Sequence, residues 1–361
     1  MKYVCKQSNQ AGQVSILIVG VMMILLSLVV VGFSQLMNRE LRQALDRQLS
    51  TQAFYSAESG VNDTYRYLAS TSSPITFTKC DDIKKPAVAT YFKTISATAA
   101  YTCILTDSSP TSLKYKLKPN ESTVFKITPA GLKALAFSWQ ATDAASSNVF
   151  RPVGSKSLLT TDAWAPATGM LEVSLYPIHP GDNRSKVMIN ARTYYLYPNA
   201  GLATAPINYA DPAQNGNIID GKCSNTVGNL GVGFGSLQRS KCNVIINGVP
   251  SGPPGPPVRA YYIKITSLYG LSDISVNGSD GANTIALPGA QTVVDVTGRG
   301  TDVLRRVEYR LAADPALSNA ARAQFGIQSA ETICKRLRVP APAQPAYNSE
   351  VVDPACRLTL P

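Results

Sequence analysis

The amino-acid sequence predicts an α+β fold, in which a long N-terminal α-helix precedes a large, antiparallel β-rich head with local disulfides. Three observations carry this prediction. The stretch from Val14 to Phe33 is almost entirely apolar, and no proline interrupts the chain before Pro74. After Ser70, glycine, proline, threonine and asparagine become frequent and apolar residues alternate with polar ones. Six of the seven cysteines form three couples that are close in sequence.

The apolar stretch has the length of a membrane-spanning helix. Only Ser15 and Ser27 interrupt its apolar composition with polar side chains, and at about 1.5 Å per residue it spans roughly 30 Å, the thickness of a bilayer core. It is longer than the apolar region of a secretory signal peptide, and no A-x-A cleavage site follows it. We therefore expect one uncleaved transmembrane helix over Val14–Phe33, with the basic residues Lys2 and Lys6 on the cytoplasmic side.

The helix is predicted to continue beyond the membrane segment. Between residues 37 and 68 apolar side chains recur every four residues, which places them on one face of a helix with charged residues between them. The members of this apolar stripe are Met37, Leu41, Leu45, Leu49, Ala53, Ala57 and Val61. As a single helix, residues 14 to 68 would be about 80 Å long.

Residues 8 to 68 carry a resemblance to a known family. A short basic leader ends at Ala11-Gly12, the apolar helix follows from Gln13, and the segment Arg42–Asn62 contains the sequence Ser-Ala-Glu-Ser-Gly. In this order the three features resemble the type IV pilin superfamily, and within it the PilX-type minor pilins. The resemblance implies a prepilin leader over residues 1–12, cut between Gly12 and Gln13 by prepilin peptidase, and a membrane and filament helix over residues 13–70.

The same resemblance implies partners and a location. Other pilin subunits, the prepilin peptidase, the inner-membrane pilus assembly machinery and membrane lipid are the expected partners. The chain would first be a single-pass protein of the cytoplasmic membrane with an extracytoplasmic C-terminal head, and would then enter an extracellular pilus. Gln13 and Leu17 depart from the Phe and Glu that the family usually has at these positions. Loss of the intramembrane carboxylate favours a minor or tip subunit over a major one, the alternative being drift in a minor subunit.

The region after the helix predicts two β-rich parts, residues 71–250 and 258–361. The Pro- and Gly-rich segment 251–257 lies between them and separates either two subdomains or only two strands. Asn247-Gly248 and Asn277-Gly278 are typical turn sequences. The predicted strands are Leu113–Leu117, Leu132–Trp139, Leu171–Tyr176, Val187–Tyr197, Val244–Ile246, Ala260–Ser267, Ile274–Val276, Thr292–Val296 and Val303–Leu311.

The cysteine spacing predicts disulfides. Cys5 lies in the predicted leader, and the other six lie in couples 23, 19 and 22 residues apart. Fifteen pairings are possible, but short loops close at the lowest entropic cost, so nearest-neighbour pairing is favoured. The candidates are Cys80 with Cys103, Cys223 with Cys242, and Cys334 with Cys356. Disulfides require an oxidising compartment, which an extracytoplasmic head would provide.

No catalytic motif is recognisable, so we expect no enzymatic activity, no cofactor and no metal. The single histidine, His179, lies in a predicted loop, and the glycine-rich segment from Gly231 to Ser236 does not have the dinucleotide-binding pattern. Oxygen ligands for calcium occur between Asp211 and Asp220, but without the spacing of an EF-hand.

The chain is basic, with a formal net charge of +11 over 361 residues. Lys114, Lys116 and Lys118 alternate with apolar residues, so one strand face would present three ammonium groups. Such a face is a candidate for binding DNA through its phosphates. The alternative is that these lysines protect a strand edge from aggregation.

These observations favour a minor, or tip, type IV pilin-like subunit that serves in assembly initiation or adhesion. Two alternatives remain open at this point. The first is a DNA-binding minor pilin for uptake, and the second is a non-pilus single-pass surface protein whose β-rich head binds a surface ligand.

Overall fold

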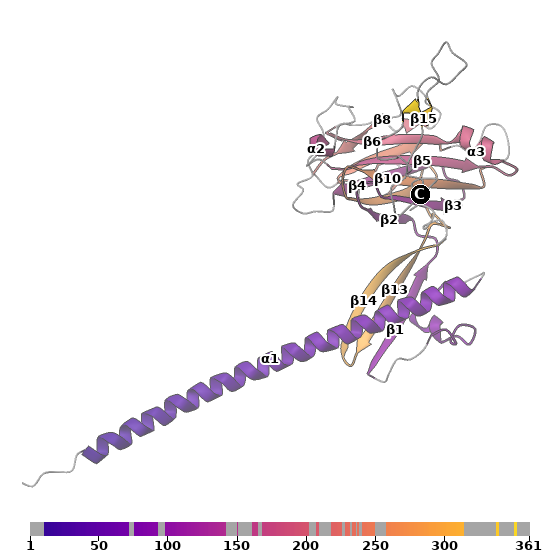
Figure 1. Ribbon diagram of the computed structural model, residues 1–361. Helices are drawn as coiled ribbons and strands as arrows, with labels where there is room; N and C mark the ends of the chain where they lie inside the picture. Colours follow the sequence, from indigo (N-terminus) through magenta and orange to yellow (C-terminus); the bar gives the residue numbers. More distant parts are fainter. Residues whose placement is uncertain are drawn as a thin grey trace, which may run out of the picture. The chain divides into compact units, whose positions relative to one another are not determined.

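A computed structural model of the chain divides into two compact units (Figure 1). The helical unit comprises Met1–Lys114, Thr128–Gly131 and Thr284–Ala313, and the sheet unit comprises Tyr115–Ile127, Leu132–Asn283 and Asp314–Pro361. The structure describes residues 11–71, 76–92, 98–141, 150, 161–164, 168–201, 207–208, 218–225, 228–231, 233–235, 237, 240–249, 258–313, 337–338 and 350–351.

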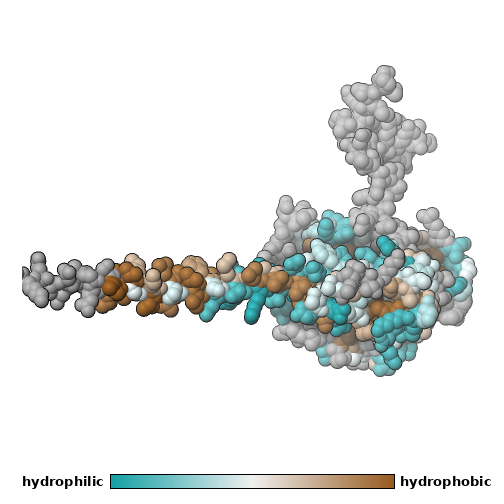
Figure 2. Space-filling view, turned by 90° about the horizontal axis from the view of Figure 1, so that it is seen from below, coloured by the Kyte–Doolittle hydropathy of each residue, from teal (hydrophilic) through white to brown (hydrophobic). Residues whose placement is uncertain are grey.

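The helical unit is built on α1 (Ala11–Ser70), a single helix of 60 residues. Its continuity confirms the predicted helix. Within the described residues, α1 is the one helix that is long and apolar enough to cross a membrane. The side chains from Ile16 to Phe33 are exposed, and Figure 2 shows apolar surface along this part of the helix and hydrophilic surface further along.

The C-terminal part of α1 packs against a three-stranded antiparallel sheet. Its strands are β1 (Ala99–Asp107), β13 (Gln291–Gly300) and β14 (Val303–Ala312), in the order β1-β13-β14. The buried residues of the helix recur at helical spacing on one face, because only that face meets the sheet. They are Ala53, Ser56, Ala57, Gly60, Val61, Thr64 and Tyr67.

A short segment covers the end of this interface. Residues 76–92 contain the 3₁₀ helix η1 (Cys80–Lys84), and the Cys80–Cys103 disulfide joins it to β1. Phe77 of this segment stacks on Tyr67 of α1, with ring centroids 5.5 Å apart. The Phe77 N–H also donates to Thr106 Oγ1 of β1 at 2.8 Å. The cover segment, as we call residues 76–92, therefore completes the small core of the helical unit.

The sheet unit contains most of an eleven-stranded sheet, whose strand β12 and first half of β2 belong to the residue ranges of the helical unit. The strand order is β12-β11-β4-β9-β8-β6-β5-β10-β3, with β2 paired to β11 and β7 paired to β9. The strands are β2 (Ser112–Leu117), β3 (Ser122–Ile127), β4 (Ala134–Ala141), β5 (Met170–Ile178), β6 (Arg192–Ala200), β7 (Ile207–Asn208), β8 (Ile218–Cys223), β9 (Cys242–Asn247), β10 (Ala260–Leu268), β11 (Ser272–Ser279) and β12 (Thr284–Ile285). Short helices α2 (Thr161–Trp164) and α3 (Arg184–Asn190) and a two-strand ladder of β15 (Leu337–Arg338) and β16 (Glu350–Val351) complete the described elements.

The expectation of an antiparallel head is correct for the sheet of the helical unit and wrong for this larger sheet. It is mixed, because β6 pairs with β8 and β7 pairs with β9 in parallel. Parallel neighbours need a long crossover, and the residues between β6 and β8 provide one. Strands from both sides of segment 251–257, which lies outside the described residues, belong to this one sheet.

Most predicted strands are present, but the predicted strand Val187–Tyr197 is wrong in its first half. Residues Arg184–Asn190 form α3, since the Asn183 side chain caps the helix by accepting the Lys186 N–H at 3.0 Å. Asn277-Gly278, a predicted turn, lies inside β11. Strands β1, β3 and β8 were not expected from the pattern. Asn247-Gly248 does end a strand, with Gly248 at φ +63°.

Candidate functional site

The exposed apolar part of α1 is the first candidate site. Ile16, Met23 and Leu26 expose 76%, 68% and 61% of their surface, and no charged residue occurs between them. An apolar surface around the whole circumference of a helix is strongly unfavourable in water. This part of α1, which contains the predicted span from Val14 to Phe33, therefore requires lipid or the apolar surfaces of other helices.

The predicted apolar stripe of α1 divides into two parts. Met37, Leu41 and Leu45 are exposed, with 67%, 59% and 55% of their surface accessible. Ala53 and Ala57 are fully buried against the sheet. The stripe thus contributes to the core of the helical unit at its C-terminal end and leaves an apolar face uncovered toward the predicted membrane segment.

Glycines bring α1 unusually close to β13. A β-carbon on Gly60 would lie 2.8 Å from Val296 Cγ1 and 3.0 Å from the Tyr101 ring. A β-carbon on Gly300 would lie 2.5 Å from the carbonyl oxygen of Leu49. Contacts under 3.0 Å require movement of the neighbouring atoms, so glycine is needed for the observed helix-to-sheet distance.

The predicted processing point lies at the beginning of the described chain. Helix α1 begins at Ala11, so the bond between Gly12 and Gln13 lies in its first turn. Residues 1–10, with Cys5, lie outside the described residues. Cleavage at Gly12 stays a prediction.

The structure bears out two of the three predicted disulfides. Cys80 is joined to Cys103 in the helical unit, and Cys223 is joined to Cys242 in the sheet unit. Cys223 and Cys242 are directly opposite each other on β8 and β9. Cys334 and Cys356 lie outside the described residues.

The three lysines of the candidate DNA face lie on and just after β2. Lys114, Lys116 and Lys118 are exposed, whereas Leu113 and Leu117 between and beside them are buried. This is the alternation expected of a strand with one face toward the core. The observed exposure pattern is consistent with a phosphate-binding surface. It is equally consistent with lysines that only keep an exposed strand from aggregating.

The arginines of β14 are engaged within the helical unit. Arg306 forms an ion pair with Asp295, and the Asp295 hydrogen bonds raise the pKa of the arginine. Arg310 lies 2.9 Å from Glu308, and the Arg305 side chain donates to Ser50 Oγ at 2.8 Å. The charges of Arg306 and Arg310 are thus partly neutralised, which makes these two arginines weaker phosphate ligands than the three lysines.

His179 is paired with the carboxylate of Asp182. Asp182 Oδ2 accepts a hydrogen bond from the backbone N–H of His179 at 2.8 Å. The same oxygen lies 2.9 Å from Nδ1 of the His179 ring. The hydrogen bond from the backbone of His179 lowers the pKa of Asp182. Gly181, with φ +81°, completes the turn between them. The pair closes the loop that follows β5.

In the part of the chain that the structure describes, no group of three or more His, Cys, Asp or Glu residues is placed to hold a metal ion. Of the calcium candidates between Asp211 and Asp220, only Asp220 is described, on β8. Its carboxylate accepts a hydrogen bond from the Asn199 side chain.

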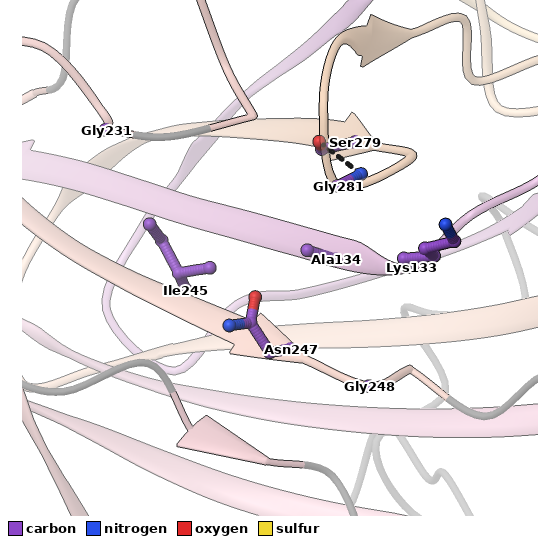
Figure 3. A pocket seen from close by; sticks show the side chains of 8 residues that line it. All are labelled: Lys133, Ala134, Gly231, Ile245, Asn247, Gly248, Ser279 and Gly281. Carbon is purple, nitrogen blue, oxygen red and sulfur yellow. Dashed lines mark hydrogen bonds between the residues drawn. The ribbon is translucent and has the colours of Figure 1, made fainter.

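The sheet unit contains a pocket of about 440 Å³ (Figure 3). Its floor is the side chains of Ala134 on β4 and Ile245 on β9. The polar side chains that line it come from three separate segments: Lys133, Asn247 and Ser279. The remaining lining residues are Gly231, Gly248 and Gly281.

Sheet register explains why these residues meet. Ala134 of β4 is directly paired with Asn247 of β9 on one side and with Ser279 of β11 on the other. Directly paired residues project to the same face of a sheet. The sequence pattern marked Asn247-Gly248 as a turn and the segment from Gly231 as glycine-rich, but no local pattern could place them beside Ser279.

No protein-family profile, no curated protein and no solved structure matches this chain. Function is therefore inferred from the apolar helix, the exposed lysines and the pocket.

Proposed function

We propose that this chain is a minor type IV pilin-like subunit, at the tip or elsewhere, that is incorporated into a surface filament for assembly initiation or adhesion. Prepilin peptidase would remove residues 1–12 by cutting between Gly12 and Gln13. The cytoplasmic membrane would first hold the subunit by its single helix, with the C-terminal head outside. The observation that carries this proposal is the unbroken course of α1 from an exposed apolar half into a half packed on a sheet.

The continuity of α1 supports transfer between two apolar environments. The helix keeps one geometry over its 60 residues, so the exposed half needs no refolding when it leaves lipid. Packing between apolar helices can replace contacts with lipid tails at a small cost in free energy, because lipid tails and apolar side chains are similarly apolar. Exposed residues such as Leu41 and Leu45 continue this apolar surface beyond the membrane segment. Other pilin subunits are thus suitable partners for the same helix.

The residue at position 17 supports a minor or tip position. In the pilin superfamily a glutamate is usual there, and it is thought to pair with the terminal amine of a neighbouring subunit. This chain has Leu17, which is exposed on α1. A subunit without that carboxylate has no buried charge that a neighbouring subunit must neutralise. It is therefore suited to the filament tip, where no further subunit follows.

The disulfides support an extracytoplasmic head. Cys80–Cys103 lies within the helical unit and Cys223–Cys242 lies within the sheet unit. Disulfides form and persist in oxidising compartments and are rare in the cytosol. A head on the outer side of the membrane, with Lys2 and Lys6 inside, is consistent with this requirement and with the distribution of positive charge.

Mass determination of the mature N-terminus tests the proposal. The chain purified from membranes of cells that contain prepilin peptidase should begin at Gln13. A Gly12→Val variant should retain the leader, and Gly20→Val, a change within the same helix, should be processed normally. An intact Met1 in the unsubstituted chain would establish the alternative of a non-pilus single-pass surface protein, and a cut at another residue would also overturn the proposal.

DNA binding is the second candidate function, and the observation that favours it is the exposure of Lys114, Lys116 and Lys118. Neutralisation of phosphates releases counterions, so affinity should fall steeply with salt. Replacing all three lysines with alanine should weaken binding and reduce the salt dependence. A matched triple substitution of exposed Lys79, Lys84 and Lys186 controls for net charge. Unchanged affinity of the first variant, or binding that does not depend on salt, would remove this face as a DNA site.

A further inference from the structure

We propose that the pocket around Ala134 in the sheet unit binds an acidic monosaccharide, a sugar unit that carries a carboxylate. The pocket is lined by Lys133, Ala134, Ile245, Asn247 and Ser279 together with three glycines (Figure 3). The inference rests on the pocket's preformed shape, on its polar groups and on the charge of Lys133.

The pocket is held open by the surrounding backbone. Phe234, which is 1% exposed, packs with Ala134, Ala136 and Leu230 and so anchors the glycine-rich loop to the sheet. In that loop Gly233, at φ +87°, approaches so closely that a β-carbon on it would lie 2.7 Å from Ser279 Oγ. The loop and the sheet therefore fit together without a ligand, and a preformed site loses less entropy on binding.

The turn between β11 and β12 forms another side of the pocket. The Gly281 N–H donates to Ser279 Oγ at 3.0 Å, which orients that hydroxyl. Asp280 Oδ1 accepts the N–H groups of Ala282 and Asn283 at 2.8 and 2.7 Å. These hydrogen bonds fix the turn, whose small residues Ser279, fully buried, and Gly281 line the pocket.

The polar groups match a sugar. Asn247 offers an amide that both donates and accepts, and Lys133 offers an ammonium group, whereas the hydroxyl of fully buried Ser279 is engaged by the Gly281 N–H. These polar groups come from different segments and surround a small apolar floor. A sugar has a complementary arrangement, because its hydroxyl groups surround an apolar ring face. A volume of about 440 Å³ lies within the usual range of small-ligand pockets.

The charge selects an acidic sugar. Lys133 is exposed, and among the described residues that line the pocket it is the charged one. The carboxylate of Asp280, in the same turn, accepts hydrogen bonds from two backbone N–H groups, which lower its pKa, and the Lys133 charge lowers that pKa further. A ligand carboxylate would therefore share the Lys133 ammonium with Asp280. A ligand carboxylate would form a charge-assisted hydrogen bond with the Lys133 ammonium, which is stronger than a bond between neutral groups. An extended peptide is a poorer match because the floor provides only the side chains of Ala134 and Ile245 for an apolar anchor.

This inference deepens the adhesive role proposed above, but its test does not require a filament. Binding is measured on the full chain in neutral detergent, by saturation-transfer NMR and calorimetry. The probes are N-acetylneuraminic acid and glucuronic acid, with N-acetylglucosamine as the neutral sugar and N-acetyl-alanyl-alanine as a peptide carboxylate. We expect at least one acidic sugar to bind with a dissociation constant of about 1 mM and the neutral sugar to bind about tenfold more weakly.

Three variants locate the site. Lys133→Gln should weaken binding of the acidic sugar about tenfold and leave the neutral sugar unchanged. Ala134→Leu, which fills the floor, should abolish both. Lys186→Gln removes an equivalent exposed charge from α3 and should change neither. Near-ultraviolet circular dichroism of buried Trp139 and Trp164 verifies that each variant is folded.

Several results would overturn the inference: no binding of either acidic sugar, equal binding of the neutral sugar, equal binding of the peptide, or unchanged affinity in Lys133→Gln or Ala134→Leu. A failure of the pilin proposal is recognised separately, since an intact Met1 would leave the sugar measurement unaffected.

Discussion

Gly298 on β13 lies directly against the backbone of Ala57 on α1, with no space for a β-carbon between them. Gly300, two residues further along the same strand, faces the backbone of Leu49 and Ala53 in the same way. The sheet of the helical unit is therefore in contact with the helix backbone itself. This contact joins the C-terminal half of α1 to the head.

Replacing Gly298 with alanine should destabilise the helical unit. The added β-carbon meets backbone atoms of α1, which cannot rotate away as a side chain could, so helix and strand must separate. Overpacking of this kind costs about 1–3 kcal/mol, and occasionally more. Hydrogen exchange of the β13 amides should become faster. Gly32→Ala, at a helical glycine with nothing within 4 Å, is the matched control and should leave these amides unchanged.

Removing the Cys80–Cys103 disulfide should loosen the cover segment. The bond closes a loop with a sequence separation of 23, which corresponds to about 3 kcal/mol through the unfolded state. Cys80→Ala with Cys103→Ala should increase proteolysis within residues 76–92. Cys223→Ala with Cys242→Ala should leave this segment protected and affect the sheet unit instead. Equal protection of the cover segment in both double variants would contradict the expectation.

Acid should loosen the same segment through Asp82. Hydrogen bonds from Lys85 and from the backbone of Lys79 and Thr78 lower the pKa of Asp82 to about 2. An unfolded aspartate has a pKa of about 3.9, so the folded state favours the ionised form. The stabilisation is complete above about pH 4 and is lost as the pH falls toward about 2.

This pH dependence is measured from NMR signals of residues 76–92 during an acid titration. Asp82→Asn should lack the transition and should have a looser cover segment at neutral pH, because the ion pair with Lys85, 2.8 Å long, is absent. Asp81→Asn is the control, since Asp81 is exposed and its pair with Lys84 is on the surface. An identical transition in Asp82→Asn would assign it to another group.

A charge in the apolar half of α1 should reduce membrane retention. Leu25→Arg places a guanidinium within the predicted span, at a cost of about 2.5–3.5 kcal/mol. Leu45→Arg is matched in exposure, at 55% against 54%, but lies beyond the span. Alkaline extraction of membranes should release more of the Leu25→Arg variant than of the Leu45→Arg variant. Equal release would contradict a membrane-spanning role for Val14–Phe33.

Local patterns predicted much of the fold. The apolar run and the four-residue period specify α1, because helix formation depends on neighbours within a turn. The couples Cys80–Cys103 and Cys223–Cys242 followed from short loop closure. The strand predicted for Val187–Tyr197 is wrong in its first half, where α3 forms instead. The hydrogen bond from the Lys186 N–H to the Asn183 side chain caps this helix and outweighs the alternating pattern.

By itself the sequence determined that this protein has a long, partly membrane-compatible helix, a β-rich head and sequence-local disulfides. Tertiary structure alone decided that β6 and β8 run in parallel, that Gly298 meets Ala57, and that Lys133, Asn247 and Ser279 surround one pocket. The physical reason is the separation along the chain over which each kind of interaction acts. Periodicity and short loops act within about 25 residues, whereas strand register joins segments far apart in the chain, and their proximity is set by packing of the whole sheet.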